Sequence, residues 1–142
     1  MKHDVTAGFD EALYKILKGS YIHRHSYWYM PLVYICSPFS GDEETNMAKA
    51  RVYSRFAYLM GYIPFCPHIY FPQFCYEETE REHVVHMNNV FLGKCSEVWV
   101  FGEKISAGMQ AEIEKARTKD KVKVRYFTEG LEEKEQEDET DD

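Results

Sequence analysis

Four short apolar runs mark the chain, and the segments between them carry apolar residues at helical spacing. The first run covers residues 32–36 and is apolar at every position, which is typical of a strand buried on both faces. Residues 62–65, 97–101 and 122–127 predict three further strands. Pro64 places the second strand at or near a sheet edge, because proline has no N–H to donate to a neighbouring strand.

The segments between the strands predict three helices. One covers residues 44–60 and ends at Gly61, a second covers residues 80–94, and a third contains Glu112 and ends near residue 119. Residues 66–79 combine prolines with aromatic residues and are interpreted as a long ordered loop. Because strands and helices alternate, we expect a Rossmann-like (flavodoxin-like) three-layer α/β sandwich with a four- to five-stranded parallel sheet.

The chain divides into three parts. Residues 1–31 form an N-terminal helical and aromatic extension, with an amphipathic helix expected over residues 9–17. It is interpreted as a cover for the sheet, with a lid or an oligomer arm as alternatives. The α/β domain spans residues 32–131. Residues 132–142 carry eight acids and one lysine, and their net charge of −7 equals that of the whole chain. This composition predicts a disordered acidic tail.

Charge and cysteine content indicate which partners and which cellular compartment to expect. Residues 1–131 are electrically balanced and the tail is acidic, which argues against a surface for nucleic acid. The four cysteines form no CxxC pair, which favours buried thiols in a reducing compartment. No signal peptide or apolar run of membrane-spanning length is recognised, so a cytoplasmic protein without membrane contact is expected.

The carboxyl ends of parallel strands meet at one edge of a sheet, which brings residues 37–42, 67–74 and 102–112 around one pocket. Glu112 is the candidate for chemistry there, because it lies at the edge of the apolar helical stripe of Ile105, Met109, Ile113 and Ala116. The alternative is a boundary residue whose carboxylate simply reaches water.

Other polar residues near this edge have two interpretations each. Ser37, Ser40 and Gly41 would suit a phosphate at a helix N-terminus or form a plain turn. Ser106 is an N-cap or a hydroxyl that faces the pocket. His68 lines the pocket, as a possible proton donor, or packs within its loop.

His83 and His86 lie three apart on a helix, but no third ligand is spaced to join them, so neither a metal nor a cofactor is expected. For Tyr34 and Asn88, which lie in apolar surroundings, a satisfied buried hydrogen bond is sufficient explanation.

Several of these segments together resemble the nucleoside 2-deoxyribosyltransferase superfamily, and in particular its small DUF4406-labelled branch in phages and bacteria. The resemblance spans residues 32–127. It rests on residues 34–39, residues 61–64, Asn88 seven residues before Cys95, and Gly108 and Met109 followed by Glu112 and Ala116.

The resemblance implies that Glu112 is a nucleophile that attacks C1′ of a 2-deoxyribosyl group and that Tyr34 orients it. It also implies a nucleoside or nucleotide substrate. The substrate-binding positions would be Ser37, Pro38, Phe39, Ser40, Gly41, His68, Ser106, Gly108 and Met109.

Two departures from the pattern matter. The transferases usually carry Asp where this chain has Asn88, and an amide cannot donate a proton to the leaving base as a carboxylic acid does. They also carry Asp where this chain has Ser106, which instead resembles the related deoxynucleoside 5′-monophosphate N-glycosidases, although residues 37–41 lack their Arg. The expected function is therefore N-glycosidic cleavage or deoxyribosyl transfer, with a non-catalytic nucleotide-binding module as the alternative.

A homo-oligomer, most simply a dimer, is also expected. Residues 21–29 and 70–76 are rich in aromatic side chains that a chain of 142 residues would not readily bury by itself.

Overall fold

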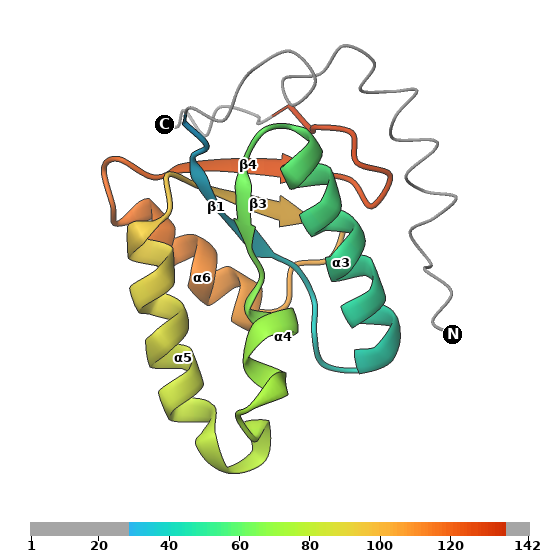
Figure 1. Ribbon diagram of the computed structural model, residues 1–142, viewed down its shortest axis with the longest axis vertical. Coiled ribbons are helices and arrows are strands. Elements are labelled where there is room, and N and C mark those ends of the chain that lie inside the picture. Colours follow the sequence, from blue (N-terminus) through green and yellow to red (C-terminus); the bar gives the residue numbers. More distant parts are fainter. Residues whose placement is uncertain (1–28, 136–142) are drawn as a thin grey trace, which may run out of the picture.

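The computed structural model describes residues 29–135 and has three layers, with a sheet between helices (Figure 1). The four strands are β1 (Leu32–Cys36), β2 (Ile63–Phe65), β3 (Glu97–Phe101) and β4 (Lys123–Phe127). All pairings are parallel and the strand order is β2-β1-β3-β4, so the Rossmann-like α/β prediction is confirmed. The described residues form four strands, and Pro64 lies on an edge strand as expected.

The helices cover both faces of the sheet. Helix α3 (Glu43–Leu59) packs on one face, where its buried Ala50, Tyr53 and Phe56 meet Val33, Ile35 and aromatic residues of β3 and β4. Helices α5 (Glu77–Lys94) and α6 (Ala107–Arg117) cover the other face. Successive side chains of a strand point to opposite faces, so Tyr34 and Cys36 of β1 face α5 and α6.

The strand order reverses between β1 and β3. The chain leaves β1 toward β2 on one side of the sheet and leaves β3 toward β4 on the other. Ser37 directly follows β1 and Gly102 directly follows β3, so the two segments diverge at this edge. Such a reversal is the usual ligand crevice of an open parallel sheet.

The prediction of a loop over residues 66–79 is wrong. This segment contains the short helix α4 (Pro67–Tyr70) and the 3₁₀ turn η1 (Phe71–Gln73), and α5 already begins at Glu77. Pro67 is the first residue of α4, a position where its fixed φ favours a helix and its missing N–H costs nothing. The first turn of α5 ends in a kink at Glu80, whose carboxylate accepts from the Tyr76 N–H at 2.7 Å.

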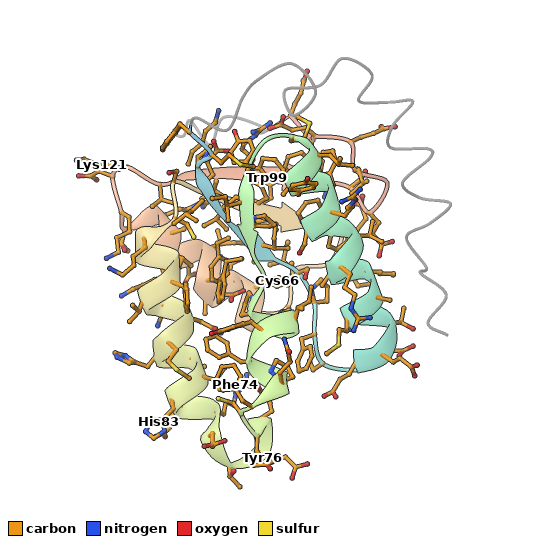
Figure 2. The ribbon with its side chains drawn as sticks, viewed as in Figure 1. Cys66, Phe74, Tyr76, His83, Trp99 and Lys121 are labelled. Carbon is orange, nitrogen blue, oxygen red and sulfur yellow. The ribbon has the colours of Figure 1, made fainter. Side chains whose placement is uncertain are left out.

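Aromatic side chains cluster at the end of the α4 to α5 hairpin farthest from the sheet (Figure 2). Phe74 and Tyr76 are 57% and 76% exposed there. They belong to the residues from which the sequence predicts a homo-oligomer, and that assembly stays a prediction. Cys36, Cys66 and Cys95 are buried free thiols, as expected. Within residues 29–135 no helix is long and apolar enough to cross a bilayer.

The prediction that a disordered tail begins at residue 132 is wrong for residues 132–134. Glu133 forms an antiparallel bridge with Phe127, and the Lys134 N–H donates to the Tyr126 carbonyl at 2.8 Å. The Glu133 carboxylate accepts two hydrogen bonds from Arg125, at 2.7 and 2.8 Å, and these lower its pKa. The acidic composition predicted that these carboxylates are solvated, but Arg125 pairs with Glu133, and a count of charges does not reveal such a pair. Residues 136–142 and the helix predicted over residues 9–17 lie outside the described residues.

We predict that a chain ending at Glu135 is more stable than one ending at Leu131. The shorter chain loses the bridge to Phe127, its main-chain hydrogen bonds and the Arg125 to Glu133 pair, so its melting temperature should fall by roughly 3–8 °C. Calorimetry of the two chains measures the difference. Equal melting temperatures would show that this bridge contributes no stability.

Candidate active site

A cavity of about 460 Å³ opens at the carboxyl end of β1, between α4, α5 and the first turns of α6. In Figure 1, α4 lies between α5 and α6 on one side and α3 on the other. Nine of the twelve residues predicted for the site line it, whereas Tyr34, Pro38 and Gly41 do not. The lining comprises Ser37, Phe39, Ser40, Pro67, His68, Phe71, Pro72, Glu77, Arg81, Val84, Val85, Asn88, Asn89, Ser106, Ala107, Gly108, Met109, Ala111, Glu112 and Lys115.

Glu112 lies where the sequence places it, at the edge of the buried stripe of α6. Its Oε2 accepts a hydrogen bond from the Tyr34 hydroxyl. Its Oε1 accepts from the Cys36 thiol, with an S···O distance of 3.3 Å. The boundary interpretation, in which the carboxylate simply reaches water, does not account for two donors on a carboxylate that also lines the cavity.

Burial controls the protonation of this cluster. Desolvation raises the pKa of Glu112, although the hydrogen bonds from Tyr34 and Cys36 oppose the shift. Burial, together with the neighbouring charge of Glu112, also raises the pKa values of Tyr34 and Cys36 well above their usual range. Both groups therefore keep their protons at neutral pH and remain donors to the carboxylate.

His68 lines the cavity, as one of its two interpretations predicted. Its ring stacks on Phe39, with 4.7 Å between the ring centres. Its Nε2–H donates to the Ser37 carbonyl at 2.8 Å, since a carbonyl can only accept. Burial lowers the pKa of His68, so the ring is neutral at pH 7 and its one proton is already donated. This geometry favours a stacking wall over a proton donor.

Two buried polar atoms of the cavity have no hydrogen-bond partner among residues 29–135, namely Ser37 Oγ and Asn88 Oδ1. The expectation of a satisfied buried hydrogen bond holds for Tyr34 but is wrong for this atom of Asn88. An unpaired buried polar group costs about 1–3 kcal/mol, and such a group in a cavity is suited to pair with a bound ligand.

The two helix N-termini beside the cavity differ in charge. Ser106 caps α6 by accepting from the Met109 N–H at 3.2 Å, and no acid occupies the first turn of that helix. Helix α3 is capped by Asp42 and carries Glu43 and Glu44 in its first turn. An anion is therefore favoured at α6 and disfavoured at α3, beside Ser40 and Gly41. The φ of +100° at Gly41 gives it a turn-forming role instead.

Sequence reasoning missed three contributors to the site. Cys36 was interpreted only as a buried thiol, while Arg81 and Lys115 place positive charge at the cavity. Arg81 pairs with Glu77 at 2.8 Å, and both are substantially exposed. Glu77, Arg81, Val84 and Asn88 follow helical spacing, so a helix predicted to begin at residue 77 would have revealed Arg81, though not Cys36 or Lys115. In residues 29–135 no cluster of three His, Cys, Asp or Glu side chains could hold a metal.

The raised pKa of Glu112 predicts a pH-dependent cost in stability. The native state binds this proton more tightly than the unfolded chain, so the free energy of unfolding falls as pH rises from the ordinary glutamate pKa through the raised one. Glu112→Gln removes that cost. Its stability relative to the wild type should therefore increase as pH rises above the ordinary glutamate pKa.

Urea denaturation at a series of pH values measures this difference, with Glu114→Gln on the exposed side of α6 as the matched control. A stability difference that is the same at every pH, or equal for the two variants, would contradict the prediction.

Comparison with known proteins identifies a family to which no activity is assigned. Residues 31–127, well over half of the chain, match the family described as "Domain of unknown function (DUF7768)". No curated protein matches the chain. The resemblance to the nucleoside 2-deoxyribosyltransferases thus remains an expectation, and the chain belongs to the DUF7768 family.

Proposed function

We propose that this protein cleaves or exchanges the N-glycosidic bond of a 2′-deoxynucleoside or its 5′-monophosphate, with Glu112 as the nucleophile. The observation that carries the proposal is the Glu112 carboxylate itself. It lines a cavity at the strand-order reversal, and buried neutral donors hold each of its oxygens. Any buried carboxylate needs donors, but this one also borders a cavity, and a nucleophile must be ionised, oriented and partly desolvated.

The reaction would proceed by double displacement. A Glu112 oxygen attacks C1′ while the C1′–N bond breaks, and the electron pair leaves with the base nitrogen through an oxocarbenium-like transition state. The product is a deoxyribosyl ester of Glu112. Water, or a second base, then attacks C1′ and releases the carboxylate. The Tyr34 hydroxyl orients Glu112 throughout.

The walls of the cavity suit the parts of a deoxynucleotide. The stacked Phe39 and His68 rings, with Phe71 and Val84 as further lining, offer an apolar surface for a base. Ser106 and the first turn of α6 suit a phosphate. Lys115 supplies positive charge that the loop after β1 lacks, whereas Arg81 at the cavity is already paired with Glu77.

Asn88 favours a second candidate, a nucleotide-binding module without catalysis. Its side chain lines the cavity, but an amide cannot protonate a departing base. In this case the unpartnered Asn88 Oδ1 would accept a hydrogen bond from the ligand, and Glu112 would contact the sugar without attacking it. Turnover separates the two candidates.

We predict that Glu112→Gln keeps the fold and ligand binding and loses release of the base by about hundredfold or more, because an amide is a very poor nucleophile. Chromatography of free base from the four common deoxynucleosides and their monophosphates measures the rate. The exposed Glu114→Gln serves as the control and should keep wild-type turnover. Full activity of Glu112→Gln would exclude the nucleophile, and an inactive wild-type protein that binds would support the binding module.

We also predict that deoxynucleoside monophosphates bind more tightly than the matching nucleosides, and that Gly108→Ala removes much of this preference. A methyl group at Gly108 would meet only Ser106 Oγ, at 4.0 Å, so the protein accommodates it while a phosphate against α6 loses room. The preference should fall roughly tenfold.

Titration calorimetry measures both affinities. Gly93→Ala is the matched control, because it is a helical glycine outside the cavity lining whose added methyl would meet Lys119 at an ordinary 3.8 Å. An unchanged preference in Gly108→Ala would place the phosphate elsewhere.

A further inference from the structure

The two oxygens of the Glu112 carboxylate are held by donors of very different strength. Oε2 accepts from the phenol of Tyr34, and an O–H to carboxylate contact is among the strongest hydrogen bonds in proteins. Oε1 accepts from the thiol of Cys36 at 3.3 Å, and an S–H group is a weak donor. More negative charge therefore remains available on Oε1 than on Oε2.

Cys36 acts as a weak donor to Glu112 Oε1 and not as a reactive thiol. Its side chain is fully buried, and its nearer acceptor is Glu112 Oε1 rather than the Met109 carbonyl, which lies 3.8 Å away. Because burial and the adjacent carboxylate raise its pKa, the sulfur keeps its proton and is not itself a nucleophile.

The unequal donors matter once an ester forms. The oxygen that bonds to C1′ becomes the ether oxygen of the ester and accepts hydrogen bonds poorly, whereas the other becomes the carbonyl oxygen and still accepts well. Attack through Oε2 would sacrifice the strong contact with Tyr34. Attack through Oε1 sacrifices only the weak contact with Cys36 and leaves the Tyr34 hydroxyl on the carbonyl oxygen.

On the basis of the proposed function, we infer that Oε1 is the attacking atom of Glu112 and that Cys36 is a positioning residue that holds this oxygen without quenching it. The Oε1–C1′ bond forms as the C1′–N bond breaks, and the electron pair departs with the base, which takes its proton from water. Cys36 and Tyr34 both keep their protons during the step.

The first test needs no substrate. The Glu112 carboxyl carbon is titrated by ¹³C NMR in the wild type, Cys36→Ser and Cys36→Ala. A hydroxyl at position 36 is a stronger donor and should lower the pKa of Glu112, whereas removal of the donor should raise it. Cys95→Ala is the matched control, since Cys95 is buried in the same core layer as Cys36. A Glu112 pKa that does not move in either variant would overturn the positioning role.

The second test follows release of the base in a single turnover across pH, with the deoxynucleoside monophosphate that the wild type turns over fastest. Cys36→Ser should slow the first displacement about tenfold and shift the acid limb of the rate profile to lower pH. Cys36→Ala should slow it about threefold and shift that limb to higher pH. A merely structural role for Cys36 would move neither limb.

The third test identifies the attacking oxygen directly. A 2-deoxy-2-fluoro substrate analogue slows both displacements, and a base that leaves readily keeps the first fast enough for the ester to accumulate. The structure of the trapped ester should show Tyr34 on its carbonyl oxygen. Tyr34 on the ether oxygen would overturn the inference. If Glu112→Gln is inactive but both Cys36 variants keep the wild-type pH profile, this inference alone is overturned. If Glu112→Gln is fully active, the proposed function on which the inference rests is overturned.

Discussion

The hydrogen bond from Tyr34 to Glu112 connects the buried central strand to the helix that delivers the carboxylate. Its partners are 78 residues apart in the chain, so it forms only when β1 and α6 pack against each other. Tyr34 and Cys36 lie two residues apart and therefore share a face of β1, which lets both reach the same side chain. The hydrogen bonds offset part of the cost of burying a charge, and the pKa of Glu112 remains raised because they do not offset all of it.

The opposite face of the sheet provides the packing that tolerates such a site. There α3 places Tyr53 and Phe56 against aromatic residues of β3 and β4, with the Tyr53 and Phe101 rings stacked 4.1 Å apart. Arg125 lies over the Trp99 ring at 4.9 Å and pairs with Glu97 at the edge of this cluster. One face of the sheet thus packs aromatic residues against α3, whereas Tyr34 and Cys36 on the other face donate to the carboxylate of α6. Strained or polar active sites are commonly stabilised by a well-packed core elsewhere.

The two loops at the carboxyl edge of the sheet also differ in the charge of the helix that each one leads into. The loop after β1 leads into α3, whose N-cap Asp42 accepts from the Thr45 N–H and whose first turn contains Glu43 and Glu44. The loop after β3 leads into α6, whose first turn lacks an acid and borders the cavity. Two strand-to-helix turns of similar appearance therefore differ in how well they suit an anion.

The sequence by itself determined the sheet, the helices near it and Glu112 as the candidate residue, because buried strands and amphipathic helices impose periods of two and 3.6 residues on the local sequence. The same periodicity placed Ser106 as an N-cap. It failed for residues 66–79, where closely spaced prolines and aromatics hid two short helices, and for residues 132–134, whose acids looked solvated.

Tertiary structure alone decided which side chains meet. The contact of Cys36 with Glu112, the unpartnered oxygen of Asn88 and the pairing of Glu133 with Arg125 all depend on how separate elements pack against one another. A local pattern records which face of an element is buried. It does not record which atom of another element lies opposite, because that is fixed only when the layers pack.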